Sequence, residues 1–187
     1  MSKALIVFGT RYGATASTSE EIAKTMLQKG FEVDLRDAKK EKVKSIAEYE
    51  LIVVGSGIQI NRWTSEPEDF LKKFQKQLAT KKVALFVCCG SASDKTKPEL
   101  AANAKRKYLE EKAAKYNLQP VALGLFGGIY NYNNMPWLAE KAMNADRPRM
   151  KAAYTETDPG IYDTRDLNAI RAWAEKLADI TNSRKDV

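Results

Sequence analysis

A turn rich in hydroxyl groups follows the first apolar run of the chain. It reads Thr10-Arg11-Tyr12-Gly13-Ala14-Thr15, it comes directly after Ala4–Phe8, and a helical pattern begins at its end. The two threonine hydroxyls, the amides beside Gly13 and the N-terminus of the helix converge on one point, which is an arrangement that binds phosphate. The spacing fits neither G-x-x-x-x-G-K-[ST] nor G-x-G-x-x-G, so a nucleoside-triphosphate loop and a dinucleotide turn are both excluded. An ordinary polar connection is the alternative.

Two more loops of small and polar residues follow later apolar runs. One is Gly55-Ser56-Gly57-Ile58-Gln59-Ile60-Asn61-Arg62-Trp63, and the other is Cys89-Gly90-Ser91-Ala92-Ser93-Asp94. Glycine lets the backbone approach a flat ring, backbone amides can bond the polar edge of that ring, and Ile58 or Trp63 can cover one face. Each of these segments, taken alone, is more simply interpreted as an ordinary connecting loop than as a binding loop. Three of them at one edge of a sheet favour a binding site.

The residues that usually perform side-chain catalysis are scarce. The chain has no histidine, and its two cysteines, Cys88 and Cys89, are neighbours. The absence of histidine excludes Ser-His-Asp and Cys-His catalysis and imidazole metal sites. A disulfide between neighbours is strained and a metal site needs more ligands, so we expect two buried thiols in a reducing compartment. We predict no catalytic acid or base and no metal ligand.

The formal net charge is +7, but the basic residues are scattered among acidic ones, as on solvated helix faces. No zinc-finger, RNP or helix-turn-helix signature accompanies them, so we do not expect nucleic-acid binding. An anionic small molecule, a carrier protein or an anionic membrane surface fits the charge better. No apolar run approaches the length of a membrane span, and we expect a cytoplasmic protein, with a peripheral position at the inner face of the membrane as the alternative.

The elements that must position these loops alternate along the chain. Five short runs are apolar on both faces, as is typical of parallel strands covered by helices on both sides. They predict an α/β fold with a doubly wound, five-stranded parallel sheet and helices on both faces, in a single domain spanning residues 1–187. The predicted strands are Ala4–Phe8, Phe31–Leu35, Leu51–Val54, Val83–Val87 and Pro120–Phe126.

Four helices are predicted between and after these strands. The first starts near Thr15 or Ala16 and ends at Gly30, and the second starts with a capping box of Ser65 and Glu68. The third covers Lys97–Lys115, and the last begins at Asp163-Thr164. The side chains expected to face inward from the last three helices are Phe70, Leu71, Phe74, Leu78, Leu100, Ala101, Ala104, Tyr108, Leu167, Ile170, Ala174 and Leu177.

With these motifs the chain resembles the flavodoxin-like FMN proteins over essentially its whole length. Thr10-x-Tyr12-Gly13-Ala14-Thr15 is similar to the hydroxyl-rich loop that wraps the FMN phosphate in that family. Gly55–Trp63 and Cys89–Asp94 match in position the two loops that enclose its isoalloxazine ring. More narrowly, Thr10-Arg11-x-Gly13, the second loop and a late aromatic and basic segment resemble the menaquinone-dependent protoporphyrinogen IX oxidase branch.

The resemblance implies a redox protein that transfers electrons through FMN, with a redox protein, a quinone or a porphyrinogen as its partner. It leaves open whether the chain is an electron carrier or an enzyme. A cofactor-free α/β module that binds an anionic partner is the alternative from another class. Thr10, Arg11, Tyr12, Gly13, Ala14 and Thr15 are the implied phosphate ligands. The implied ring-lining residues are Ser56, Gly57, Ile58, Gln59, Trp63, Cys89, Gly90, Ser91 and Ala92.

Three features depart from the family pattern. Many flavodoxins are acidic and carry an aromatic residue in the third loop, whereas this chain is basic and Cys89–Asp94 has none. Arg11 and Arg62 are expected to face the cofactor and to favour its reduced, negatively charged form. A segment at Tyr130–Asp158 is inserted before the last helix, either as a lid or as a docking surface for an acceptor, a substrate or a membrane. Its aromatic, apolar and basic residues are Tyr130, Tyr132, Trp137, Leu138, Met143, Arg147 and Arg149.

Overall fold

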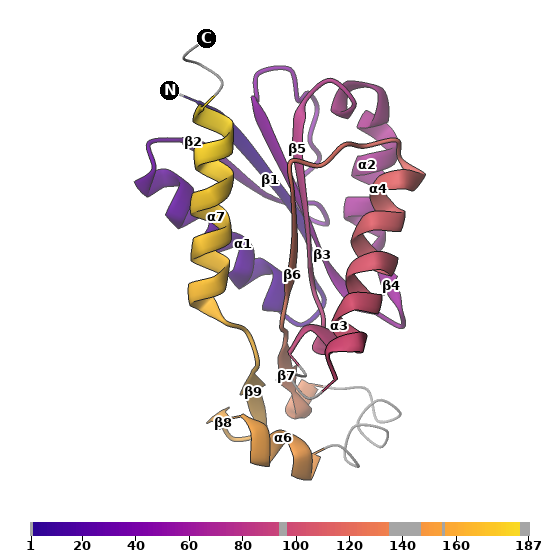
Figure 1. The fold of residues 1–187 in the computed structure, drawn as a ribbon, viewed down its shortest axis with the longest axis vertical. Helices are drawn as coiled ribbons and strands as arrows, with labels where there is room; N and C mark the ends of the chain where they lie inside the picture. The colour runs from indigo at the N-terminus through magenta and orange to yellow at the C-terminus, as the bar shows by residue number, and fades with distance from the viewer. Residues whose placement is uncertain (1, 94–96, 135–146, 155, 184–187) are drawn as a thin grey trace.

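The computed structural model describes residues 2–93, 97–134, 147–154 and 156–183. A sheet of five parallel strands forms its centre (Figure 1). Their order is β2-β1-β3-β5-β6, which is the flavodoxin-like order of doubly wound sheets and confirms the predicted fold class. The strands are β1 (Lys3–Gly9), β2 (Glu32–Asp37), β3 (Leu51–Gln59), β5 (Lys82–Cys88) and β6 (Ala122–Phe126). Strand order reverses between β1 and β3, and a ligand crevice is expected at their carboxyl ends.

A sixth, short strand joins the sheet. Strand β4 (Arg62–Trp63) pairs antiparallel with the end of β3, so that Ile58 faces Trp63 and Gln59 faces Arg62. The expectation that Gly55–Trp63 is entirely loop is therefore wrong, because β3 continues through residue 59 with β4 as its additional partner. Ile60 and Asn61 form the two-residue turn, with φ angles of 48° and 59°.

Helices cover both faces of the sheet, as predicted (Figure 1). The apolar side chains of α1 (Ala14–Gln28) and α7 (Leu167–Asn182) pack on one face, where Ile6 and Phe86 belong to the same cluster. The side chains of α2 (Ser65–Leu78) pack on the other face with Leu5 and Leu85. On that second face α3 (Pro98–Lys105) and α4 (Glu111–Lys115) are joined by a π-helical turn, Arg106–Glu110.

One predicted helix cap and one predicted helix start are wrong. Helix α2 has Thr64 at its N-cap and Ser65 as its first helical residue, and no side chain caps it. Helix α7 begins at Leu167 behind Asp166, whose Oδ1 accepts a hydrogen bond from the Ala169 amide at 3.0 Å. The chain is still in a strand at residue 163, so the helix cannot begin there. Leu100 and Leu167, which were expected to face inward, are exposed.

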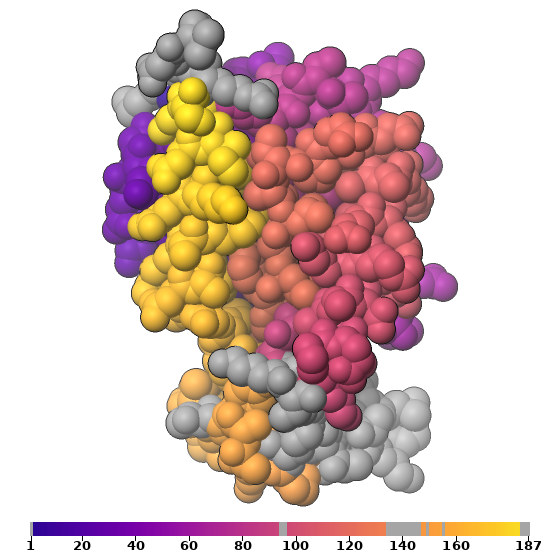
Figure 2. All heavy atoms as spheres, in the orientation of Figure 1, coloured from indigo at the N-terminus to yellow at the C-terminus, as the bar shows by residue number. Residues whose placement is uncertain are grey.

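A small antiparallel sheet lies beyond the carboxyl ends of the large one (Figure 1). Its order is β7-β9-β8, and Tyr132, Met150 and Tyr162 form a small buried cluster beside it. Figure 2 shows α6 in orange at this end of the molecule, below α7 in yellow. The segment comprises β7 (Ile129–Asn131), a short 3-10 helix (Tyr132–Asn134), α6 (Arg147–Ala153), β8 (Glu156–Asp158) and β9 (Ile161–Asp163). Trp137, Leu138 and Met143 of the predicted insert, and Asp94 of the third loop, lie outside the described residues.

Candidate functional site

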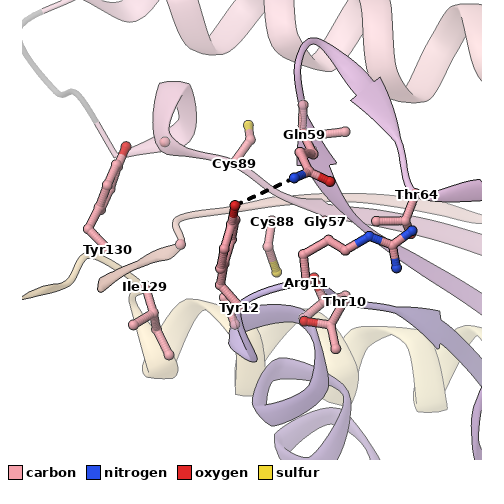
Figure 3. A pocket seen from close by; sticks show the side chains of 15 residues that line it. Thr10, Arg11, Tyr12, Gly57, Gln59, Thr64, Cys88, Cys89, Ile129 and Tyr130 are labelled. Atoms are coloured by element: carbon pink, nitrogen blue, oxygen red, sulfur yellow. Dashed lines mark hydrogen bonds between the residues drawn. The ribbon is translucent and has the colours of Figure 1, made fainter. Parts of the chain in front are cut away.

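A cavity of about 190 Å³ opens at the carboxyl ends of β1, β3 and β5, where the strand order reverses (Figure 3). All three predicted loops contribute to it, and so does the connection from β6 to β7. The lining residues are Thr10, Arg11, Tyr12, Ala14, Thr15, Gly57, Ile58, Gln59, Thr64, Cys88, Cys89, Gly90, Gly128, Ile129 and Tyr130.

The turn after β1 presents backbone amides at one end of this cavity. Gly13 occupies the N-cap of α1 with φ 90°, a left-handed conformation that favours glycine. No side chain caps the helix there, and the Gly13 amide itself donates to Thr10 Oγ1 at 3.0 Å. The first-turn amides of α1 therefore carry the partial positive charge of a helix N-terminus toward Ala14 and Thr15, which line the cavity.

Close approach of β3 to α1 shapes the same end of the cavity. A β-carbon added at Gly57 would lie 3.1 Å from Thr15 Oγ1, so a side chain at residue 57 would press on the hydroxyl. Thr15 is itself buried, so its hydroxyl has little room to move away from such a side chain. Glycine at residue 57 keeps the space beside the threonine free.

Arg11 lines the cavity, but its charge is already paired. Its Nη1 and Nη2 donate to the two carboxylate oxygens of Glu66 at 3.0 and 3.2 Å. Arg62 lies on β4, is exposed and is not among the cavity-lining residues. Arg11 thus lies at the cavity with its charge offset by a carboxylate, whereas Arg62 is exposed and outside the cavity lining.

Several predicted ring-lining residues support the site from behind. Trp63 is 5% exposed, and its Nε1 donates to the Tyr108 carbonyl at 2.8 Å within the core. Ser56 is fully buried and its Oγ accepts from the Thr64 amide at 3.0 Å, which holds Thr64 at the cavity wall. Ser91 and Ala92 belong to a short 3-10 helix and lie outside the lining of this cavity.

Two tyrosines flank the other end of the cavity. Tyr12 rises from the turn after β1 and accepts a long hydrogen bond from Gln59 Nε2 at 3.5 Å (Figure 3). Tyr130 stands on β7 beside Gly90, where a β-carbon would be only 1.7 Å from its hydroxyl. The start of the inserted segment thus places an aromatic residue beside the third loop.

The residues that sequence reasoning missed are Thr64, Cys88, Gly128, Ile129 and Tyr130. A signal for three of them was present, because Gly127-Gly128 directly follows the fifth apolar run, as the other loops follow theirs.

The two cysteines are buried free thiols, as expected. Burial raises the pKa of Cys88 to about 11 and also raises that of Cys89. A thiol in this state is a poor nucleophile at neutral pH, because the thiolate is the reactive form. The described residues contain no cluster of potential metal ligands and no helix long and apolar enough to cross a membrane.

The fold and the cavity define a doubly wound protein with a cavity at the switch point of its sheet, and comparison with known proteins assigns the family. A family model described as a flavodoxin domain matches residues 5–158. This protein therefore belongs to the flavodoxin-domain family, whose cofactor is FMN.

Individual relatives are distant. Protoporphyrinogen IX dehydrogenase [quinone] of Escherichia coli K12 is 22% identical over 180 residues, covering 96% of this chain and 97% of its own length. A flavodoxin from the domain Archaea superposes with a TM-score of 0.55 at 18% identity and covers 96% of this chain and 98% of its own. Rubredoxin oxygen:oxidoreductase from Desulfovibrio gigas gives 0.60 at 14% identity over 99% of this chain and 37% of its own. The two structures show that the fold is shared.

The residues present fit FMN. One end of the cavity offers backbone amides and threonine hydroxyls, which suit a phosphate, and the other offers two aromatic rings and glycine backbone, which suit a flat ring. The volume of about 190 Å³ is below the 300–1,000 Å³ of pockets that enclose drug-sized ligands. A ligand as large as FMN would therefore keep part of its surface in solvent.

Proposed function

We propose that this protein binds FMN in the cavity and transfers electrons through the flavin. The observation that carries the proposal is the two-ended cavity at the switch point, with amides and hydroxyls at one end and Tyr12 and Tyr130 at the other. Within it, the backbone amides and threonine hydroxyls of the turn from Thr10 to Thr15 hold the phosphate. The Tyr12 side chain of the same turn extends toward the ring, which Gly57–Gln59 and Cys89–Gly90 border. We further propose that residues 1–187 form a single domain.

The side chains bind and orient the cofactor and take no covalent part. Bound FMN supplies the redox chemistry by accepting and releasing electrons through its ring. The α1 amides stabilise a phosphate dianion, and Gly57 and Gly90 let the backbone approach the ring edge. Both cavity-lining thiols have raised pKa values, so they stay protonated and do not compete for reaction with the flavin.

Within this function we propose an oxidoreductase coupled to a quinone, acting on a reduced tetrapyrrole of the porphyrinogen type. The support is the Escherichia coli relative with that activity in its name, which this chain matches along 96% of its length. The additional sheet β7-β9-β8 supplies Tyr130 to the cavity and stands where a second flat molecule could approach the exposed part of the ring. A peripheral position at an anionic membrane would suit a lipid-soluble quinone, whereas a role as electron carrier would need a protein partner instead.

FMN titration of the apoprotein, followed by flavin fluorescence, tests the binding. We expect saturable uptake of one FMN, and we expect Thr15→Ala and Gly13→Val to weaken it. Thr25→Ala on the same helix is the matched control, because its hydroxyl bonds the Glu21 carbonyl away from the cavity. An apoprotein that takes up no FMN would leave the cofactor-free anion-binding module as the function.

Turnover assays with the FMN-loaded protein test the reaction. Oxidation of protoporphyrinogen with a menaquinone analogue is the expected result. No turnover there, with rapid electron exchange with a ferredoxin-dependent reductase, would assign the protein as a carrier.

A further inference from the structure

Three consecutive residues join the two walls of the cavity without lining it. Asp163 ends β9, and Thr164 and Arg165 follow it just before α7. We call Asp163-Thr164-Arg165 the strap. None of its members is among the cavity-lining residues, yet it contacts both the first turn of α1 and the β6–β7 connection.

Arg165 holds the α1 wall. Its Nη1 donates to Ser17 Oγ at 2.6 Å, to the Ala14 carbonyl at 3.3 Å and to Thr18 Oγ1 at 3.3 Å. Ala14 lines the cavity, so the guanidinium fixes the helical turn whose amides face the proposed phosphate. These acceptors lie about 150 residues earlier in the chain, which makes the contact a tertiary one.

Asp163 offsets the free-energy cost of burying the Arg165 guanidinium. The Arg165 side chain is only 7% exposed, and Nε and Nη2 bond the two carboxylate oxygens of Asp163 at 2.9 and 2.6 Å. A buried guanidinium costs free energy unless it is paired and hydrogen-bonded, and an apolar side chain would fill the same space more cheaply. The arginine is therefore better explained by the geometry that it imposes than by stability alone.

Thr164 holds the β6–β7 connection. Its hydroxyl accepts from the Gly128 amide at 3.1 Å and donates to the Gly128 carbonyl at 2.9 Å, and its own amide donates to that carbonyl at 3.0 Å. Gly128 lines the cavity and leads directly into Ile129 and Tyr130. The strap also packs flat against this connection, because a β-carbon at Gly127 would lie 2.3 Å from the Thr164 carbonyl oxygen.

We propose that the strap positions the two ends of the FMN site separately, with Arg165 setting the phosphate end and Thr164 setting the ring end. The inference rests on the proposed function. Both are positioning residues, since neither touches the cavity. The separation follows from their contacts, because Arg165 bonds the first turn of α1 and Thr164 bonds the β6–β7 connection, and each of these elements lines the cavity.

Comparing FMN with riboflavin, which lacks the phosphate, tests the separation. We expect Arg165→Gln to weaken FMN binding about tenfold while riboflavin binding changes less than about twofold, so that the ratio of the two affinities falls. Arg165→Lys keeps the charge but loses the forked geometry, and we expect it to restore the ratio in part. We expect Thr164→Val to weaken both ligands about equally, by about fivefold, and to leave the ratio unchanged.

Arg171→Gln is the matched control. Arg171 also joins α7 to α1, through an ion pair with Glu21, but neither residue lines the cavity. The ratio of FMN to riboflavin affinity in Arg171→Gln should equal that of the wild-type protein. Hydrogen exchange of the apoproteins provides a second measurement, and the amides of residues 14–17 should exchange faster in Arg165→Gln than in Arg171→Gln.

Several outcomes would overturn the inference. An equal loss of both ligands in Arg165→Gln would show that Arg165 acts only on overall stability. A changed ratio in Thr164→Val would show that the two ends of the site are not positioned separately. If Arg165→Gln does not fold, Arg165→Lys decides the question by the same ratio. A wild-type protein that binds neither ligand would refute the proposed function itself, whereas a wild-type protein with normal binding and a ratio indifferent to Arg165 would refute the strap alone.

Discussion

The hydroxyl of Tyr130 lies directly over the α-carbon of Gly90, so close that a β-carbon at residue 90 would be 1.7 Å from it. Gly90→Ala must therefore push the tyrosine ring away from its place at the cavity. We expect FMN affinity to fall about tenfold, because a stacked aromatic side chain contributes about 1 kcal/mol or more beyond its buried area. Flavin fluorescence titration measures the effect. Ser91→Ala, one residue further and outside the cavity lining, should bind as the wild-type protein does.

Release of Arg11 from its ion pair should strengthen phosphate binding. Glu66→Gln removes the carboxylate that Arg11 contacts through two hydrogen bonds, leaving the guanidinium free to face a phosphate. We expect FMN affinity to rise about two- to fivefold at low salt and the gain to shrink in 1 M salt, as charges near the surface are screened. Glu68→Gln is the control, since Glu68 pairs with Lys112 and Lys115 instead. A gain of equal size in both variants would contradict the assignment to Arg11.

Stability in acid should depend on Glu68. Partial burial alone would raise the pKa of this carboxyl, but hydrogen bonds from Lys115, Lys112 and Tyr116 outweigh it and lower the pKa to about 2. A carboxyl whose pKa is lower in the folded protein than in the unfolded one stabilises the fold at pH values above its ordinary pKa. That stabilisation is lost as the pH falls toward 2. Between pH 5 and 2 the wild-type protein should therefore lose about 1–2 kcal/mol more unfolding free energy than Glu68→Gln.

Urea titrations at several pH values measure this difference. Glu20→Gln, a change at an exposed carboxylate of α1, serves as the control and should follow the wild-type curve. Identical curves for the wild-type protein and Glu68→Gln would show that the ion pairs are screened by solvent.

The turn between β3 and β4 carries strain that can be relieved. Ile60 has φ 48° although it is β-branched, and the residue is 87% exposed, so it gains little from packing. Asparagine is favoured at such a position, and Ile60→Asn should raise the unfolding free energy by about 1 kcal/mol, or the melting temperature by about 2–4 °C. Ile60→Val keeps the branched side chain and should melt with the wild-type protein. A lower melting temperature for Ile60→Asn would mean that the isoleucine makes a stabilising contact.

The elements and the three loops could be predicted because their signals are local. An apolar run, a turn of glycine and hydroxyl residues and a helical pattern lie within about ten residues of one another. The direction in which a side chain points could not be predicted from such local signals. Trp63 points into the core because the two-residue turn at Ile60 and Asn61 sets its register against β3 and its indole finds the Tyr108 carbonyl.

The parts of the site that escaped prediction depend on long-range contacts. Tyr130 reaches the cavity because it lies over Gly90, 40 residues earlier, and the charge of Arg11 is offset by Glu66, 55 residues later. The spacing of apolar and polar residues along the chain does not reveal contacts between residues this far apart in the sequence. In the sequence, the buried Arg165 cannot be told from the exposed basic residues. Only its hydrogen-bond acceptors on α1, which the structure shows, distinguish it from them.

The strap also fixes when the site can be completed during synthesis. A nascent chain emerges from the N-terminus onward, and its early segments can begin to fold while later ones are still being made. The turn at Thr10–Thr15 is therefore exposed to the cell long before Arg165 leaves the ribosome. Until then the first turn of α1 lacks its guanidinium contact and Gly128 lacks its threonine partner. We therefore expect FMN to bind late in synthesis, only to chains that have been translated past the strap.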